Sequence, residues 1–168
     1  MKNLSYKKQK YQFLLIGKSL FSYLILQRLI KLNIEICGVV TLKSRGYNDD
    51  FFDLTKICKQ KKISLHKTNN INNDKSVKWI IDKKPDFIFC FGWSQLIKGK
   101  LVKVYKNKII GFHPTKLPNN RGRSPLIWSI ILNIKKSAIT FFYINNGIDD
   151  GKLIDQSEFF ISSNETSK

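Results

Sequence analysis

Short uninterrupted apolar runs alternate with longer amphipathic segments through the first two thirds of this chain. Continuous apolar runs predict strands buried on both faces, as in parallel sheets covered by helices. The predicted strands are Phe13–Ile16, Ile34–Leu42, Ser64–His66, Asp86–Phe91 and Lys108–Phe112. The predicted helices between them are Leu20–Leu32, Phe51–Lys61, Ser76–Asp82 and Leu101–Tyr105. The pattern indicates an α/β fold with a mostly parallel sheet and helices on both faces.

The last third of the chain has a different pattern. Pro125–Ile134 shows helical spacing, with proline in the first turn, where it is tolerated. Ala138–Ile144 and Lys152–Ile161 alternate like antiparallel strands. Arg45–Asp50 is a predicted polar loop. With 168 residues, no repeat and no linker, residues 1–168 are expected to form a single domain.

The formal net charge of +18 would ordinarily suggest nucleic acid or an anionic membrane as a partner. The charge comes from lysines spread along the chain together with Asn and Ile, which indicates compositional bias instead of a binding stripe. Nucleic acid is therefore not the expected partner, and an RNA-binding module is kept as an alternative. Arginine is scarce, so the presence of Arg121 and Arg123 on either side of Gly122 suggests that the planar guanidinium group is required at this segment. The alternative is that this segment is a solvated loop.

The cysteines carry no motif. Cys37, Cys58 and Cys90 lie far apart without a CxxC pair, which predicts free thiols, buried at Cys37 and Cys90, and no metal site. This usage fits a reducing cytoplasm. The sequence shows no signal-peptide pattern, and no apolar stretch approaches the roughly 20 residues of a membrane-spanning helix. We therefore expect a cytoplasmic protein without a membrane partner.

Two nucleotide-binding motifs are incomplete. Gly17-Lys18-Ser19 follows the first predicted strand like the end of a phosphate-binding loop, but Gln12 stands where that motif requires glycine. The GxGxxG pattern of dinucleotide-binding folds is also missing after this strand. These observations argue against an NTPase and a nicotinamide enzyme. Gly17 is expected to allow a tight turn into the following helix.

Ligands of open α/β sheets bind beyond the carboxyl ends of the strands. That rule selects the turns Gly92–Ile97 and His113–Arg123. His113 ends a predicted strand, and the acidic pair Asp149-Asp150 lies between two glycines of a later loop. A histidine and a carboxylate placed in this way can form an acid–base pair. His66 has no acidic or glycine-rich context and is expected to be structural or exposed.

The segments FHPTKLPNNRGRSPLIW and GIDDGKLI together resemble the signature of the folate-dependent formyltransferase family. Its members include methionyl-tRNA, glycinamide ribonucleotide and nucleotide-sugar N-formyltransferases. The residues in step with the signature are His113, Leu117, Pro118, Arg121, Gly122, Pro125, Gly147, Asp149 and Gly151. The resemblance covers nearly the whole chain and implies the family's Rossmann-like domain.

The resemblance also implies a reaction and its participants. Formyl would pass from N10-formyltetrahydrofolate, without a metal, to a primary amine, with His113 taking a proton or donating to the oxyanion and Asp149 orienting the imidazole. Residues expected to bind the cosubstrate are Phe91, Gly92, Trp93, Ser94, Ile97, Asn145, Gly147 and Asp149. Residues expected to bind the acceptor are Pro114, Thr115, Arg121, Arg123 and Trp128.

One departure concerns the family's catalytic asparagine, which aligns with Gly111. Losing an oxyanion donor typically costs about 100- to 1000-fold in rate. We expect Gly111 to leave a gap filled by water or by a donor from Ser94, Gln95, Thr115 or Asn145. A working enzyme with a substitute donor is the preferred interpretation. The alternative is a catalytically degenerate protein that binds folate or a nucleotide sugar.

The acceptor is inferred from finer features of the resemblance. The chain stops at SSNETSK, soon after the last predicted strand, so the family's C-terminal region is expected to be lacking or truncated. The tRNA-binding barrel of methionyl-tRNA formyltransferase has no counterpart, which makes that activity the alternative. The His-Pro-Thr-Lys-Leu-Pro segment and Trp128 favour a small-molecule amine acceptor, a nucleotide-linked amino sugar. The resemblance also admits a homodimer.

Overall fold

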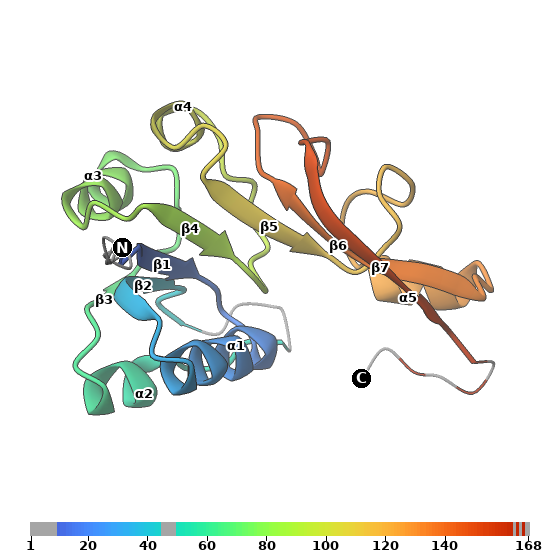
Figure 1. Cartoon of the computed structure of the whole chain (residues 1–168), viewed down its shortest axis with the longest axis horizontal. Helices are drawn as coiled ribbons and strands as arrows, with labels where there is room; N and C mark the ends of the chain where they lie inside the picture. The colour runs from blue at the N-terminus through green and yellow to red at the C-terminus, as the bar shows by residue number, and fades with distance from the viewer. Residues whose placement is uncertain (1–9, 45–49, 163, 165, 167–168) are drawn as a thin grey trace, which may run out of the picture.

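The computed structural model describes residues 10–44, 50–162, 164 and 166, so the predicted loop Arg45–Asp50 lies outside the described residues except for Asp50. Seven strands form one sheet in the order β3-β2-β1-β4-β5-β6-β7 (Figure 1). Pairing is parallel from β3 to β5 and antiparallel from β5 to β7. The strands are β1 (Gln12–Ile16), β2 (Glu35–Thr41), β3 (Leu65–Lys67), β4 (Phe87–Cys90), β5 (Ile109–His113), β6 (Lys136–Tyr143) and β7 (Leu153–Phe160).

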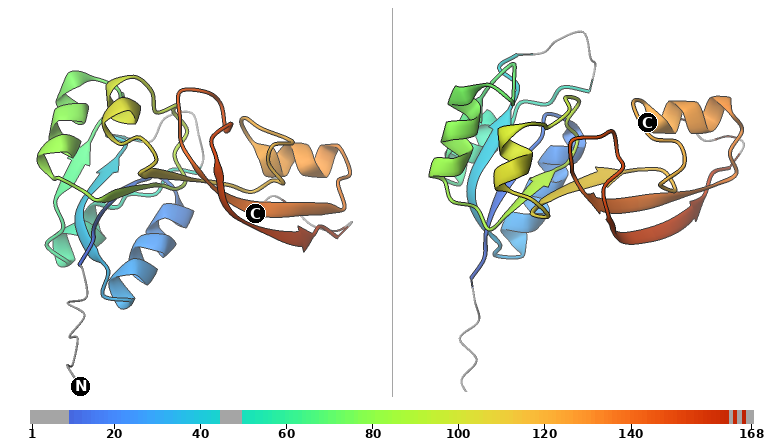
Figure 2. Two further views of the ribbon diagram at one scale, coloured as in Figure 1. Left: turned by 45° about the horizontal axis from the view of Figure 1, so that its top comes forward. Right: turned by 90° about the horizontal axis from the view of Figure 1, so that it is seen from above.

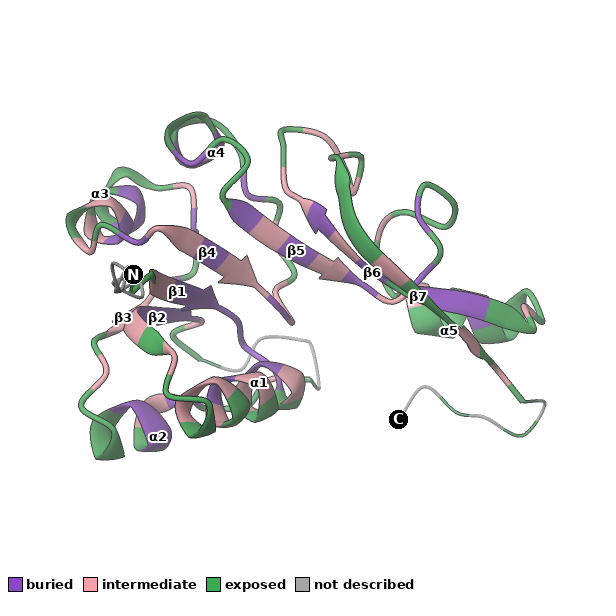
Figure 3. Ribbon diagram, viewed as in Figure 1, coloured by how far each residue is buried: buried purple, intermediate pink, exposed green. Residues whose placement is uncertain are grey.

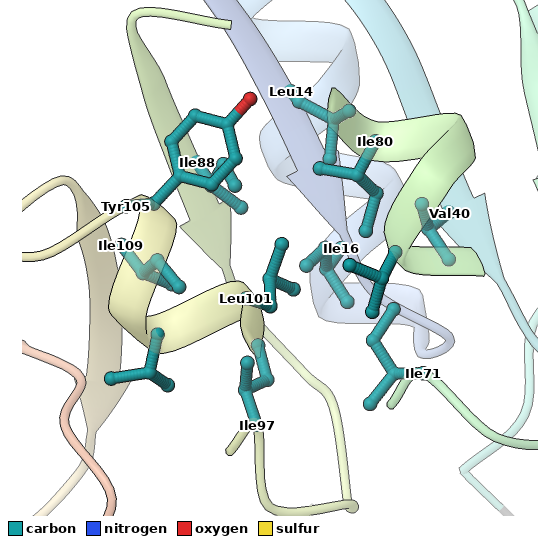
Figure 4. Close-up of a cluster of buried hydrophobic side chains, with 12 residues drawn as sticks. Leu14, Ile16, Val40, Ile71, Ile80, Ile88, Ile97, Leu101, Tyr105 and Ile109 are labelled. Carbon is teal, nitrogen blue, oxygen red and sulfur yellow. The ribbon is translucent and has the colours of Figure 1, made fainter. Parts of the chain in front are cut away.

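Helices cover both faces of the parallel part of the sheet, as predicted (Figures 1 and 2). The helices are α1 (Leu20–Lys31), α2 (Thr55–Gln60), α3 (Asp74–Asp82), α4 (Lys100–Val104) and α5 (Pro125–Ile131). Two hydrophobic clusters show which helix lies where. Buried residues of α1 and α2 pack with Leu15 and Val39 on one face. Those of α3 and α4 pack with Leu14, Ile16 and Ile109 on the other face (Figure 4).

The turn from β1 into α1 depends on a close approach of backbone to side chain. A Cβ on Gly17 would lie 2.4 Å from Ser22 Oγ and 2.6 Å from the Phe91 carbonyl oxygen, so only glycine fits. Ser19 then caps α1, with its hydroxyl accepting from the Ser22 amide at 3.3 Å. This agrees with the tight turn expected at Gly17.

The helix predicted to begin at Phe51 begins later, at Thr55. The Phe52 amide donates to the Lys18 carbonyl at 2.7 Å, which ties this segment to the end of β1 instead of to a helical turn. The Asp53 carboxylate then accepts from the Thr55 amide at 2.9 Å. A local turn at Asp53 and a tertiary hydrogen bond at Phe52 therefore override the apolar spacing.

The antiparallel strands extend the sheet beyond the part that α1 to α4 cover (Figure 1). In the β5–β6 register Gly111 lies opposite Phe142 and His113 lies opposite Thr140. Most of β7 and α5 is exposed (Figure 3). None of the helices in the described ranges is both long and apolar enough to cross a membrane.

Candidate functional site

His113 is the last residue of β5 and is 5% exposed. Its Nε2 lies 3.0 Å from the carbonyl oxygen of Asn120, and its Nδ1 lies 3.6 Å from Oδ2 of Asp149. The predicted proximity of His113 and Asp149 is therefore confirmed. The imidazole of His113 therefore lies at the carboxyl end of β5, at the edge of the sheet where α/β folds bind their ligands.

The loop after β6 returns Asp149 to this edge. Asp149 adopts a left-handed backbone conformation with φ of 46°, which aspartate tolerates better than most residues. Its Oδ2 also accepts a hydrogen bond from the Gly122 amide at 2.9 Å. The neighbouring carboxylate, Asp150, lies where a Cβ on Gly147 would be, and the carboxylate within 4 Å of the His113 ring is that of Asp149. Asp149 thus joins the later loop to both the histidine and the Arg-Gly segment.

The surroundings of His113 define its proton arrangement. The Asn120 carbonyl accepts but cannot donate, so Nε2 carries a proton. Nδ1 faces the Asp149 carboxylate at 3.6 Å, beyond hydrogen-bond distance. Each ring nitrogen therefore has an oxygen neighbour, and these two neighbours orient the ring.

A hydrogen-bond network fixes the loop that follows His113. Thr115 is buried, and its hydroxyl lies 3.2 Å from the carbonyl oxygens of Asn119 and Asn120. Thr140 donates to the Thr115 carbonyl at 2.6 Å. Gln156 of β7 donates to the carbonyl of Leu117 at 3.0 Å. The Thr115 side chain, expected to meet the acceptor, is therefore engaged inside its own loop.

Other residues predicted to bind the acceptor lie at the surface. Arg121 and Arg123 are exposed, and Pro114 is half-buried. Trp128 is 53% exposed on α5, among several exposed apolar residues of that helix. Arg121, Gly122 and Arg123 follow Asn120 directly, so the arginines are close in sequence to the atoms that contact His113 and Asp149.

The turn after β4 supplies the predicted cosubstrate residues, with one correction. The Phe91 ring packs in the cluster on the α1 face, 5.2 Å from the Phe89 ring centre, because its side chain points opposite to that of Cys90. It therefore lies away from the face of β5 that carries His113. Trp93 packs against the α3–α4 cluster with its Nε1 buried and without a partner among the described residues.

The rest of this turn has mixed exposure. Ile97 is 3% exposed in the α3–α4 cluster, and Ser94 is exposed. Gly92 has a φ of +68° and accepts from the Lys18 amide at 3.1 Å through its carbonyl. A Cβ there would lie 2.1 Å from Ser19 Oγ, so glycine is required.

A hollow of about 540 Å³ separates α4 from the loop after β6. The Gly99 amide donates to Asn146 Oδ1 at 3.1 Å across it, and Asn145 Oδ1 accepts from the Gly147 amide at 2.9 Å. The lining of the hollow combines apolar side chains, side-chain amides and two lysines. Its lining residues are Gly99, Val102, Lys103, Lys106, Asn107, Ile144, Asn145 and Asn146.

Gly111 does not leave the expected gap. A Cβ built on it would lie 2.8 Å from two ring carbons of Phe142 and 3.0 Å from Cγ1 of Ile144. Phe142 is opposite Gly111 in the antiparallel ladder and is 3% exposed. An apolar ring, not water or a substitute donor, therefore fills this space. Sequence reasoning missed Phe142, because nothing in the sequence sets the β5–β6 register.

Cys90 lies beside Gly111 in the parallel β4–β5 ladder. Burial, together with the nearby Asp149 carboxylate, raises the pKa of the Cys90 thiol to about 12. The thiol is therefore protonated at neutral pH. All three cysteines are free; Cys58 is buried, and the partly buried Cys37 and Cys90 pack against the α3–α4 cluster.

The second histidine has a structural environment. His66 Nε2 lies 3.0 Å from Ser76 Oγ, and the ring stacks on Trp79 at 5.1 Å. Burial lowers the pKa of His66. Within the described ranges, no three His, Cys, Asp or Glu side chains gather in a group that could hold a metal ion.

Comparisons with known proteins agree with the sequence signature. The family model described as Formyl transferase matches residues 9–168. A bifunctional polymyxin resistance protein ArnA from Wigglesworthia glossinidia brevipalpis is 32% identical over 87% of this chain and 23% of its own length. Methionyl-tRNA formyltransferase of Mycoplasma genitalium is 30% identical over 91% of this chain and 50% of its own length. The chain spans about half the length of such relatives, or less.

Solved structures share the fold. A phosphoribosylglycinamide formyltransferase from Bacillus halodurans superposes with a TM-score of 0.78 at 19% identity, over 92% of this chain and 82% of its own. The sugar 3N-formyl transferase WlaRD superposes with a TM-score of 0.66 at 24% identity, over 91% of this chain and 53% of its own. These structures show the shared fold, and the family model, which matches residues 9–168, shows that the chain belongs to the formyl transferase family.

Proposed function

We propose that this protein transfers a formyl group from N10-formyltetrahydrofolate to a primary amine, with His113 and Asp149 as the catalytic pair. The observation that carries the proposal is the His113–Asp149 contact of 3.6 Å at the carboxyl edge of the sheet. Membership of the formyl transferase family supports the reaction class.

Bound N10-formyltetrahydrofolate supplies the formyl carbon, and the acceptor nitrogen replaces N10 as the nitrogen bonded to it. Asp149 holds Nδ1 of His113, which leaves Nε2 as the ring nitrogen that meets the substrate. The Nε2 proton, directed to the Asn120 carbonyl here, is the proton available to the formyl oxygen as negative charge develops on it. Overall, the amine loses one proton and N10 gains one.

The proposed cosubstrate site is the face between β4, α4 and the loop after β6. The hollow beside Val102 and Ile144 offers apolar walls, with amide groups at Asn145 and Asn146. The buried Trp93 Nε1 is a donor that a bound polar ring can satisfy, since buried donors are rarely left without a partner. These features support folate binding at this face.

For the acceptor, we propose the amine of a nucleotide-linked amino sugar. Support comes from the fold of WlaRD, whose structure is described as a sugar 3N-formyl transferase in the presence of dTDP and 5-N-formyl-THF. The exposed Arg121 and Arg123 beside the site suit diphosphate oxygens. Methionyl-tRNA is the second candidate, favoured by relatives of about 30% identity.

The test is an acceptor panel. The purified protein is mixed with N10-formyltetrahydrofolate and with amino-sugar nucleotides, glycinamide ribonucleotide or methionyl-tRNA, and formylated product is identified by mass. A gain of one formyl group on an amino-sugar nucleotide, absent with His113→Ala, is expected. Product from methionyl-tRNA alone would reassign the acceptor. Folate binding without product from any acceptor would indicate the degenerate alternative.

A further inference from the structure

The Phe142 ring lies between the two segments that carry the catalytic pair. On one side, its Cε1 and Cζ lie 2.8 Å from the position of a Cβ on Gly111, two residues before His113. On the other, its Cδ2 lies 3.6 Å from the position of a Cβ on Gly151, two residues after Asp149. Both flanking residues are glycines, so the ring meets backbone on both sides.

The backbone on each side of the ring is fixed. Gly111 is paired with Cys90 on one strand and with Phe142 on the other. Gly151 packs closely against the Tyr143 backbone, since a Cβ on Gly151 would lie only 1.6 Å from the Tyr143 carbonyl oxygen. The Tyr143 amide in turn donates to the Lys152 carbonyl at 2.9 Å. A ring held between two fixed backbones acts as a spacer between them.

We propose that Phe142 is a positioning residue of the formyl-transfer site, whose ring sets the separation between the His113 strand and the Asp149 loop. The inference rests on the proposed function for its catalytic consequence. Asp149 lies in the loop that connects β6 to β7, and the Phe142 ring packs against this loop at Gly151. Without the ring, the loop can settle toward Gly111, and the carboxylate loses its alignment with Nδ1.

The principal variant is Phe142→Ala, compared with Phe142→Leu and with the matched control Phe141→Ala. The control removes the adjacent ring, which lies on the opposite face 5.7 Å from Phe112. Phe142→Ala is expected to lower kcat by about 100-fold with little change in KM, the cost of misplacing a catalytic group by about 1 Å. Phe142→Leu keeps apolar bulk and should retain most of the activity. Phe141→Ala should lower the thermal midpoint while leaving kcat near the parent value.

A second pair of variants tests the spacing directly. Gly111→Ala places a Cβ 2.8 Å from the Phe142 ring, so the ring must move, and kcat is expected to fall. Phe142→Leu should relieve that crowding, so the double variant should be more active than Gly111→Ala alone. Equal losses of kcat for Phe142→Ala and Phe141→Ala, or no relief in the double variant, would overturn the proposal.

A structural measurement separates this inference from the proposed function. The distance between His113 Nδ1 and Asp149 Oδ2, 3.6 Å here, is to be compared in crystal structures of the parent, Phe142→Ala and Phe141→Ala. Phe142→Ala is expected to lengthen this distance by about 1 Å, and Phe141→Ala to preserve it. If no acceptor is formylated but the distance depends on Phe142, the positioning role stands and the proposed function fails. An unchanged distance in folded Phe142→Ala would refute the positioning role.

Discussion

Replacing Asp149 with asparagine tests the electrostatic core of the site. Two unit charges at the observed 3.6 Å separation interact by about 4.6 kcal/mol at an effective dielectric constant of about 20. The side chains are only 7% and 22% exposed, so solvent screens this pair less than a surface pair. Asparagine can still accept from the Gly122 amide, so the loop should stay in place. The variant thus removes charge while preserving shape.

We expect Asp149→Asn to lower kcat by roughly 100- to 1000-fold, which corresponds to about 3 to 4 kcal/mol of transition-state stabilisation, because the carboxylate no longer faces Nδ1 of His113. Formyl transfer is measured under saturating cosubstrate, and circular dichroism checks that the fold is intact. Asp150→Asn is the matched control, because the Asp150 carboxylate lies against Gly147, whereas His113 pairs with Asp149. Retention of a third or more of the activity by Asp149→Asn, or an equal loss in Asp150→Asn, would refute the assignment.

Three further outcomes follow from titratable groups. Native Cys90 should alkylate slowly at mildly alkaline pH, because its pKa is about 12; rapid labelling detected by peptide mass would contradict its burial. The pKa of His66 is lowered in the folded protein, so the contribution of this residue to the free energy of unfolding is complete above the unfolded pKa of 6.5 and decreases as pH falls below it. In chemical denaturation, the stability of His66→Gln should therefore depend less on pH in the acid range. The ammonium groups of Lys116 and Lys136 lower the pKa of Glu158 to about 2, so its stabilising effect is present above 4.5 and lost as pH falls toward 2; NMR titration should show Lys116→Ala raising that pKa.

The parallel part of the fold was predictable from periodicity. Continuous apolar runs such as Phe13–Ile16 can be buried only between two helical layers, so β1 and its neighbours were identified. The same uninterrupted apolar pattern does not indicate which face of the sheet each side chain occupies. In a run that is apolar at every position, nothing distinguishes the face of Cys90 from the face of Phe91, so the packing of the Phe91 ring in the α1–α2 cluster was not predictable.

The site was predictable only in part. The spacing of His113 and Asp149 relative to glycines and prolines brought them together correctly. The contents of the space beside Gly111 were not predictable, because they depend on which β6 residue lies opposite it. That register is set by antiparallel pairing between segments distant in sequence, and a shift of one residue would turn Phe142 to the other face.

The contact of Gln156 with the Leu117 carbonyl links the site to an edge strand. Gln156 also donates to Thr140 at 2.8 Å, and Thr140 holds the Thr115 carbonyl. Edge strands with few buried residues open in sub-global unfolding events that leave the rest of a domain intact. Detachment of β7 would therefore release the loop that holds His113 before the parallel sheet melts. Activity should be lost at lower denaturant concentrations than helical structure is, so loss of activity should precede global unfolding.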